Sequence, residues 1–352
     1  MFASASLSLL ASLASAQFPP VPPAPPAVVP TVRVTVDSSA RTVTISAGPY
    51  EVPGMPMPDH HADDIPMMMM DGHAGVGEPL LDFTWPLDGW VHGAALTLID
   101  ADGKAVPRRL VHHINLVNFA RRQLLYTAPE RLLAMGRETE DIALPSSIGI
   151  PVASGMPMGL VLMWHNMSMT DYHGVTVSLT LDWLPTNYVP RPASVLPLYM
   201  NVINPVGRAV DLDLPAGRQS FAADFAMPLD GRILGVGGHL HDHGTGLRLD
   251  EVRGDGSRKE ILSLETERDS AGTMLRIERK LPGVTGRGIK LSKGRTYRMT
   301  GSYDNPTGRV LKGGAMVHLI GLFRPDDMAD WPAIDPNDPS WRKDMAFLRR
   351  TN

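Results

Sequence analysis

Apolar and polar residues alternate along much of this 352-residue chain. In VTVSLTLDW (residues 175–183) every second side chain is apolar, and the same alternation recurs at 32–36 and 315–323. Successive side chains of a strand point to opposite faces, so a period of two predicts half-buried antiparallel strands. Helical signals are few, and TAPERLLAMG predicts one short helix near Ala128 to Met135. The expected fold class is all-β.

The chain length and a faint internal sequence similarity predict that this fold has two domains. A chain of 352 residues favours two domains. The stretch FTWPLDGWVHG at 83–93 resembles FAMPLDGRILG at 225–235, although PLDG is also ordinary turn chemistry. We therefore expect two tandem antiparallel β-sandwich domains, jelly-roll-like in character. Their expected limits are 31–192 and 193–325, followed by a C-terminal tail at 326–352.

The N-terminus predicts export. Residues 6–14 are a short apolar stretch, and Ala14-Ser15-Ala16 fits a small-residue cleavage site, so residues 1–16 are expected to be a signal peptide. The usual basic residue is missing there, and a disordered Ala/Ser tail is the alternative. Residues 17–30 form a proline-rich spacer. The expected location is secreted or periplasmic, and with no apolar run of ~20 residues no transmembrane segment is expected.

Composition excludes several classes of site. The chain has no cysteine, which rules out disulfides, thiolate zinc sites, iron–sulfur clusters and a thiol nucleophile. A net charge of −4 without a basic run argues against a nucleic-acid partner. There is no G-x-S-x-G elbow for a serine hydrolase.

Histidines are concentrated in GGHLHDHGTG (237–246), which places His239, His241 and His243 at alternate positions. In a strand these side chains share one face, roughly 6.6 Å apart at Cα, so two imidazoles can reach one metal ion. A pair, His112-His113, occurs earlier in the chain. Adjacent strand residues point to opposite faces, so that pair can share an ion only through a bulge, a strong twist or the use of different ring nitrogens.

Taken in order, six residues form a pattern: His112, His113, His165, His239, His241 and Met316. This order resembles the copper type II, ascorbate-dependent monooxygenases, the family of peptidylglycine α-hydroxylating and dopamine β-monooxygenases. The resemblance implies two β-sandwich domains that each hold one copper across an open cleft. It further implies hydroxylation of an aliphatic C–H bond with dioxygen and ascorbate or another one-electron reductant.

The resemblance also implies a role for each half of the pattern. His112, His113 and His165 would hold the electron-transfer copper, and His239, His241 and Met316 the oxygen-activating copper. Gly237 and Ile320 stand where peptide-amidating members have arginine and tyrosine, so a glycine-extended peptide is not the expected substrate.

Ligand chemistry points to copper independently. A thioether is a soft ligand that binds Cu(I) and contributes little to zinc, so two imidazoles with one thioether suit a copper that must be stable when reduced. His243 and His318 are further candidates near the second set. A Met- and His-rich segment adds another group of candidates: His60, His61, Met67, Met68, Met69, Met70 and His73. Such clusters capture Cu(I), or are simply loosely packed surface loops.

Other functions stay open. The main alternative is a copper-binding protein without catalysis, serving storage, delivery or an assembly. HLHDH is one residue short of the H-x-H-x-D-H hydrolase pattern, and a cupin-like site would add His243 or Glu251 to the His-x-His pair. A substrate, small molecule or peptide, is not identified. A protein partner is expected to bind the proline-rich spacer or the C-terminal tail, if there is one.

Overall fold

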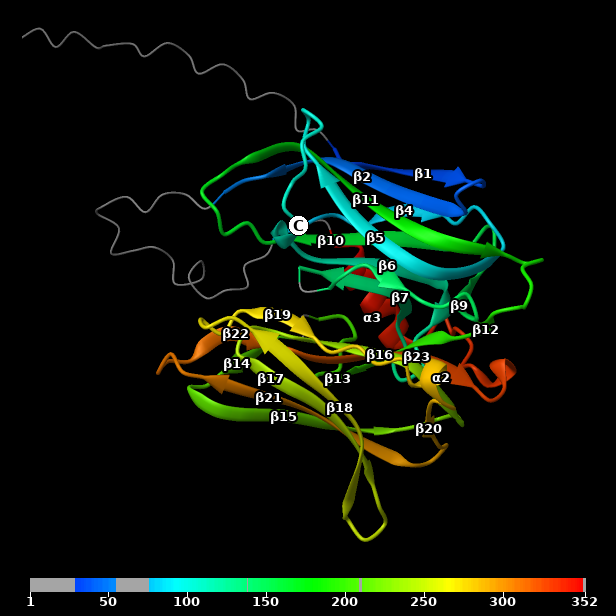
Figure 1. Cartoon of the computed structure of the whole chain (residues 1–352), viewed down its shortest axis with the longest axis vertical. Helices are drawn as coiled ribbons and strands as arrows, with labels where there is room; N and C mark the ends of the chain where they lie inside the picture. Colours follow the sequence, from blue (N-terminus) through cyan, green and yellow to red (C-terminus); the bar gives the residue numbers. More distant parts are fainter. Residues whose placement is uncertain (1–28, 55–75, 138, 209–210, 351–352) are drawn as a thin grey trace, which may run out of the picture.

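The computed structural model describes residues 29–54, 76–137, 139–208 and 211–350 and confirms an all-β protein of two β-sandwiches. Figure 1 shows the two sandwiches one above the other, with four layers of strands between top and bottom. The expected signal peptide, the part of the proline-rich spacer before residue 29 and the Met- and His-rich segment at 55–75 lie outside the described residues. None of the helices in the described ranges is long and apolar enough to cross a membrane.

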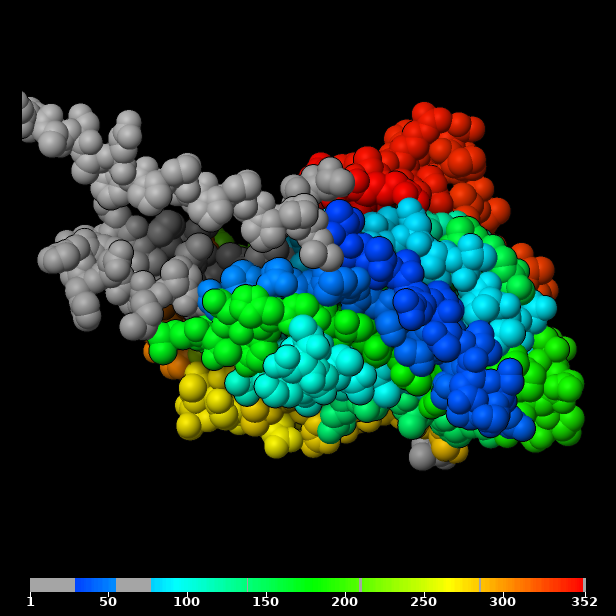
Figure 2. All heavy atoms as spheres, turned by 90° about the horizontal axis from the view of Figure 1, so that it is seen from above, coloured from blue at the N-terminus to red at the C-terminus, as the bar shows by residue number. Residues whose placement is uncertain are grey.

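The first sandwich contains two sheets. Its outer sheet runs in the order β1 (Thr31–Asp37), β2 (Thr42–Val52), β11 (Tyr172–Pro185), β5 (Gly89–Ile99), β9 (Ile148–Val152) and β12 (Ala193–Ser194), with β8 (Ile142–Ala143) beside β5. Its inner sheet runs in the order β3 (Val76–Gly77), β10 (Pro157–Trp164), β6 (Val111–Arg122) and β7 (Pro129–Gly136), with β4 (Leu81–Thr84) beside β10. Figure 2 views the molecule from the β1 and β2 side.

The second sandwich is built in the same way. Its inner sheet runs in the order β13 (Leu196–Asn201), β23 (Val317–Pro325), β16 (Gly231–Leu240) and β20 (Ile289–Leu291). Its outer sheet runs in the order β15 (Gly217–Ala226), β21 (Thr296–Asn305), β17 (Gly244–Val252), β18 (Arg258–Arg268) and β19 (Met274–Ile277). A further pair joins β14 (Leu212–Leu214) to β22 (Leu311–Ala315).

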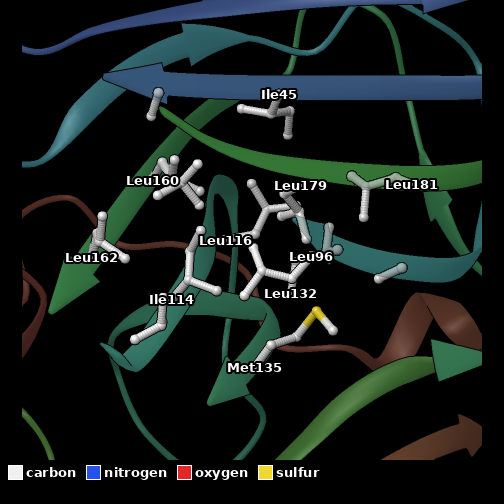
Figure 3. Close-up of a cluster of buried hydrophobic side chains, with 14 of the residues drawn as sticks. Ile45, Leu96, Ile114, Leu116, Leu132, Met135, Leu160, Leu162, Leu179 and Leu181 are labelled. Carbon is white, nitrogen blue, oxygen red and sulfur yellow. The ribbon is translucent and has the colours of Figure 1, made fainter. Parts of the chain in front are cut away.

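Alternation explains why the sheets pack in pairs. Along β11 and β21 every second side chain is buried, so each strand has one apolar face to cover. Figure 3 shows the result in the first sandwich, where Ile45 and Leu179 of the outer sheet face Leu116 and Leu160 of the inner one. The inner sheets of the two sandwiches then face each other. Their opposed faces are where the histidines lie.

The helix expected near Ala128 to Met135 is wrong, because these residues form strand β7. Leu, Ala and Met favour helices only weakly, and tertiary packing overrides that preference. Here β7 pairs with β6, and Leu132 and Met135 enter the core of the first sandwich. The Gly136 that suggested a helix stop ends a strand instead.

Helices are short and lie outside the sheets. They are η1 (Arg108–Leu110), α2 (Pro282–Thr285), η2 (Met328–Asp330) and α3 (Pro339–Leu348). Asp338 caps α3 by accepting hydrogen bonds from the N–H groups of Ser340 and Trp341, and Pro339 occupies the first turn. Asp338 and Pro339 are a helix-start signal that is visible in the sequence.

The C-terminal tail folds back onto both sandwiches. The carboxylate of Asp344, which is fully buried, accepts hydrogen bonds from Arg131 of β7 (3.0 Å) and from the backbone N–H of Gly207 (3.0 Å). The indole of Trp331 donates to the carbonyl of Arg122 (2.9 Å). The tail thus binds its own chain with groups that a partner was expected to contact, and it clamps the two sandwiches together.

Candidate metal centre

A β-bulge presents the adjacent histidines. In the pairing of β10 with β6, Met163 lies opposite His113 and Trp164 opposite Val111, so His112 is an extra residue on its strand. An extra residue turns the backbone and lets neighbouring side chains point the same way. The rings of His112 and His113 have their centroids 5.0 Å apart. The bulge that the pair required is therefore present.

His165 joins this pair from the end of the neighbouring strand. It directly follows β10, and its backbone N–H donates to the carbonyl of Leu110 at 2.7 Å, just before β6 begins. Its ring centroid is 5.8 Å from that of His112. The three histidines expected to act together in the first half of the chain do lie together.

The second sandwich presents His239 and His318 from a regularly paired stretch of β16 and β23. His239 of β16 lies directly opposite His318 of β23, with ring centroids 5.6 Å apart, and His241 follows at 5.3 Å from His239. Met316 directly precedes β23, two residues before His318. Its side chain is buried.

One buried hydroxyl ties His241 to Met316. The hydroxyl of Tyr303 accepts hydrogen bonds from the backbone N–H groups of His241 (3.2 Å) and Met316 (3.0 Å), and it donates to the carbonyl of Met316 (2.6 Å). Burial raises the pKa of Tyr303 well above its usual value, so the hydroxyl keeps its proton. Two residues that lie 75 positions apart are thus bound to one hydroxyl, and no pattern in the sequence indicates Tyr303.

The two sets of histidines meet between the sandwiches. The ring of His112 lies 5.9 Å from that of His241, which is almost fully buried. We call the six residues joined by these ring contacts the histidine cluster: His112, His113, His165, His239, His241 and His318. Two sites facing each other across an open cleft, as the resemblance implied, would keep these rings apart. The structure instead makes one continuous cluster.

A salt bridge crosses the same interface. Arg137, just after β7, donates to Asp242 at 2.7 Å, and the same carboxylate oxygen accepts the backbone N–H of Met274 at 2.7 Å. Asp242 lies between His241 and His243 in the sequence, so the pair fixes the second set of histidines relative to the first. The histidine spacing in the sequence indicates a metal site, but it does not indicate that Asp242 binds Arg137.

Burial favours the neutral imidazole at two residues of the cluster, His318 and His165. Burial lowers the pKa of His318 well below its usual value, and the nearby His239 and His113 lower it further. The pKa of His165 is lowered by burial and then by Arg137, with Asp242 acting in the opposite direction. A neutral imidazole is the form that binds a metal ion.

Hydrogen bonds to the other side of the rings orient them. The carbonyl of Gly313 lies 3.1 Å from Nδ1 of His241, so this nitrogen carries the proton and Nε2 carries the lone pair that a metal needs. Nε2 of His318 instead lies 2.7 Å from the amide nitrogen of Asn201, which donates to it. Within the cluster, His318 is thus held by Asn201 and by Tyr199, whose hydroxyl lies 3.2 Å from both of its ring nitrogens.

His243 belongs to a turn. Its φ is +67°, its N–H donates to the carbonyl of Gly272 (2.8 Å), and its carbonyl accepts from Asp304 (2.9 Å). Its ring packs on Gly272, at the β18–β19 hairpin. The other expected candidates, His60, His61, Met67, Met68, Met69, Met70 and His73, lie outside the described residues.

The spacing of the rings is compatible with imidazoles that share a metal ion. At a metal–nitrogen bond of about 2.0 Å, imidazoles that share one ion have ring centroids roughly 4.5–6 Å apart. The ring contacts within the cluster span 5.0 to 5.9 Å. Across the described ranges, however, no group of three His, Asp or Glu side chains already has its donors arranged to hold a metal. Side-chain rotation is required to aim three nitrogens at one ion.

Comparisons with known proteins give no assignment. No protein-family profile matches the chain, and no curated protein sequence does. Two structures of PNGase F, one recombinant and one a glycosylasparaginase from Flavobacterium meningosepticum, align over 80% of this chain and 96% of theirs at 9% identity, with TM-scores of 0.37 and 0.36. The mavirus major capsid protein aligns over 99% of both chains at 11% identity and a TM-score of 0.24. Likeness at this level carries no argument about activity.

The expected membership of the copper type II monooxygenase family is wrong. No family profile matches the chain, that of the copper family included, and the solved structures with which it aligns include those of a glycosylasparaginase. The resemblance rested on the order of six single side chains, and isolated histidines recur in unrelated strands for structural reasons. What survives is the histidine cluster itself.

Proposed function

We propose that this chain is an exported copper-binding protein that holds two neighbouring copper ions in the histidine cluster. One ion is bound by His112, His113 and His165, and the other by His239, His241 and Met316. The observation that carries the proposal is the packing of imidazoles from both sandwiches at ring spacings of 5.0 to 5.9 Å. Burial of the imidazoles of His112 and His241 costs free energy that a bound ion offsets.

The donor set favours copper over harder metals. The ring contacts that define the cluster join imidazoles, and the carboxylate nearest in sequence, Asp242, is already bound by Arg137. Imidazole suits copper and zinc, whereas the thioether of Met316 favours copper in its reduced state. Magnesium and calcium require oxygen ligands. Copper is the metal that uses both kinds of donor.

The geometry supports copper holding, for storage, delivery or assembly, better than catalysis. His241 is 2% exposed and Met316 9% exposed, and His112 lies against His241. A substrate would need space beside the ion at Met316. Hydroxylation of a C–H bond with dioxygen and ascorbate requires that space, and ascorbate-dependent oxygen uptake by the copper-loaded protein tests it directly.

The proposal is tested by copper binding to the purified protein. We expect two copper ions per chain after desalting, with Cu(II) spin resonance signals broadened by a close second ion. A variant carrying His112→Ala and His241→Ala should lose both ions. His243→Asn is the matched control, since asparagine tolerates the positive φ at that turn. A parent protein that retains no copper, or a double variant that retains both ions, overturns the proposal.

A further inference from the structure

Two exposed methionines follow His165. In the loop HNMSMT, Met167 is 51% exposed and Met169 is 70% exposed. Long apolar side chains lie mostly inside proteins, so two of them on one surface loop, separated by one residue, call for a reason. A thioether in water has one chemical capacity that leucine or isoleucine lacks, which is to bind a soft metal ion.

The loop is braced, so the methionines are held outward. The side-chain oxygen of Asn166 accepts from the N–H (3.0 Å) and the hydroxyl (2.7 Å) of Ser168, while its amide nitrogen donates to the carbonyls of Thr170 (2.9 Å) and Val52 (3.2 Å). Asp171 accepts the N–H of Gly54 at 2.7 Å. The loop is thereby fixed to the end of β2 on both sides of Met167 and Met169.

Close packing fixes the loop further. A Cβ on Gly54 would lie 2.7 Å from backbone atoms of both Ser168 and Met169, so only glycine allows this approach. The backbone of Met169 is therefore pressed against β2's end, and its side chain is left in solvent. A fixed backbone with exposed thioethers is the arrangement of a preformed surface site.

The loop adjoins the histidine cluster. His165, two residues before Met167, is half-buried, and its ring contacts that of His112 at 5.8 Å. It is therefore the cluster residue in direct chain continuity with the exposed thioethers. Along the chain, His165 is the imidazole nearest to these methionines, and its ring contacts that of His112.

We propose that Met167 and Met169 form a surface site that accepts Cu(I) and passes it to the histidine cluster through His165. This inference rests on the proposed copper function. Transfer is an exchange of ligands: a thioether–copper bond breaks as an imidazole–copper bond forms, and the charge on the ion does not change. The site sets how fast copper enters and not how much the protein holds.

The test is the rate of copper loading. Cu(I) is supplied without oxygen as a coloured chelate, and loss of the chelate's absorbance is followed for the parent and for Met167→Leu/Met169→Leu. We expect the double variant to load roughly tenfold more slowly, the lower end of the cost of losing a metal contact, and to reach the same final copper content. Met328→Leu is the control, because Met328 is 40% exposed in η2 on the tail. Loading of the double variant at the parent rate overturns the inference.

A second measurement separates this inference from the function on which it rests. Ag(I), which is not redox-active, is added to protein carrying ¹³C-labelled methionine methyl groups. Shifts of the Met167 and Met169 signals, with Met328 unmoved, support the surface site even if the cluster takes up no copper, in which case only the proposed function fails. Absence of such shifts overturns the surface site, whatever the cluster binds.

Discussion

The two β-sandwiches bring histidines to the same interface by different means. In the first, an irregular strand does so, because the bulge at His112 places consecutive residues on one side. In the second, the pairing is regular at the histidines, with His239 facing His318, and a buried hydroxyl binds the backbone of both His241 and Met316. The first half depends on backbone irregularity and offers nitrogen alone. The second depends on a hydrogen-bond network and adds sulfur.

This difference predicts different metal preferences for the halves. Nitrogen ligands serve both oxidation states of copper, whereas a thioether stabilises Cu(I). A cluster with a softer half and a harder half, whose rings approach to 5.9 Å, can hold two ions in unlike environments. The comparison fails if both halves show the same preference between Cu(I) and Cu(II).

The largest effect is expected from Met316→Ala. Loss of the thioether should weaken Cu(I) binding to the second half by roughly 100-fold, while Cu(II) binding changes little, because loss of a supporting metal contact costs up to about that factor. His165→Ala should weaken the binding of both Cu(I) and Cu(II) to the first half. Competition titrations with Cu(I) and Cu(II) chelators measure this. An equal loss of affinity for Cu(I) and Cu(II) in Met316→Ala would mean that Met316 is not a copper ligand.

The next effect concerns Tyr303, the support of the second half. Tyr303→Phe leaves the N–H groups of His241 and Met316 and the carbonyl of Met316 without this hydroxyl. We expect unfolding free energy to fall by about 2–4 kcal/mol, since each buried backbone group left unsatisfied costs about 1–3 kcal/mol. Urea unfolding measures it.

The copper content of the Tyr303→Phe variant sharpens the comparison. Retention of the ion in the first half with loss of that in the second is the expected result, because Tyr303 contacts only backbone atoms of the second set in the network described. Loss of both ions would show that the cluster is one shared centre and not two halves.

The sequence predicted the two halves unequally for a physical reason. Alternation is a local property, so the strands around His239 and the shared face of Met316 and His318 were readable from it. The β7 strand was misread as a helix because its pairing with β6 is not local. The adjacent histidines require a bulge if they are to share an ion, but its presence at His112 depends on the register between β10 and β6, which the sequence does not reveal.

The contact between the two halves could not be predicted from the sequence. The contact between His112 and His241, the Arg137–Asp242 ion pair and the Tyr303 hydroxyl all join residues that are distant along the chain. Spacing along one strand carries no information about which face of another sheet lies opposite. For the same reason, an ordered list of candidate ligands suggested a family to which the chain does not belong.

A smaller effect is expected from the ion pair that joins the halves. The Arg137 and Asp242 side chains are 23% and 35% exposed, so solvent screens their attraction, and a double-mutant cycle with Arg137→Gln and Asp242→Asn should give a coupling of about 0.5–1 kcal/mol. Thermal unfolding of the four proteins measures it. A coupling of zero would mean that the tail, through Asp344, and the apolar packing hold the sandwiches together unaided.

The smallest effect is expected from a histidine outside both halves. His173 is exposed and its Nδ1 lies 2.5 Å from the carboxylate of Glu51, and this hydrogen bond raises the pKa of His173 above its usual value of 6.5 and lowers that of Glu51. Because the folded pKa of His173 is the higher one, its contribution to stability is complete below the unfolded pKa and disappears as pH rises through the folded pKa. Proton NMR of the ring should show a titration midpoint that falls in Glu51→Gln. His173→Gln should leave copper content unchanged, whereas a loss of copper would mean that histidine number, and not the two-halved cluster, determines binding.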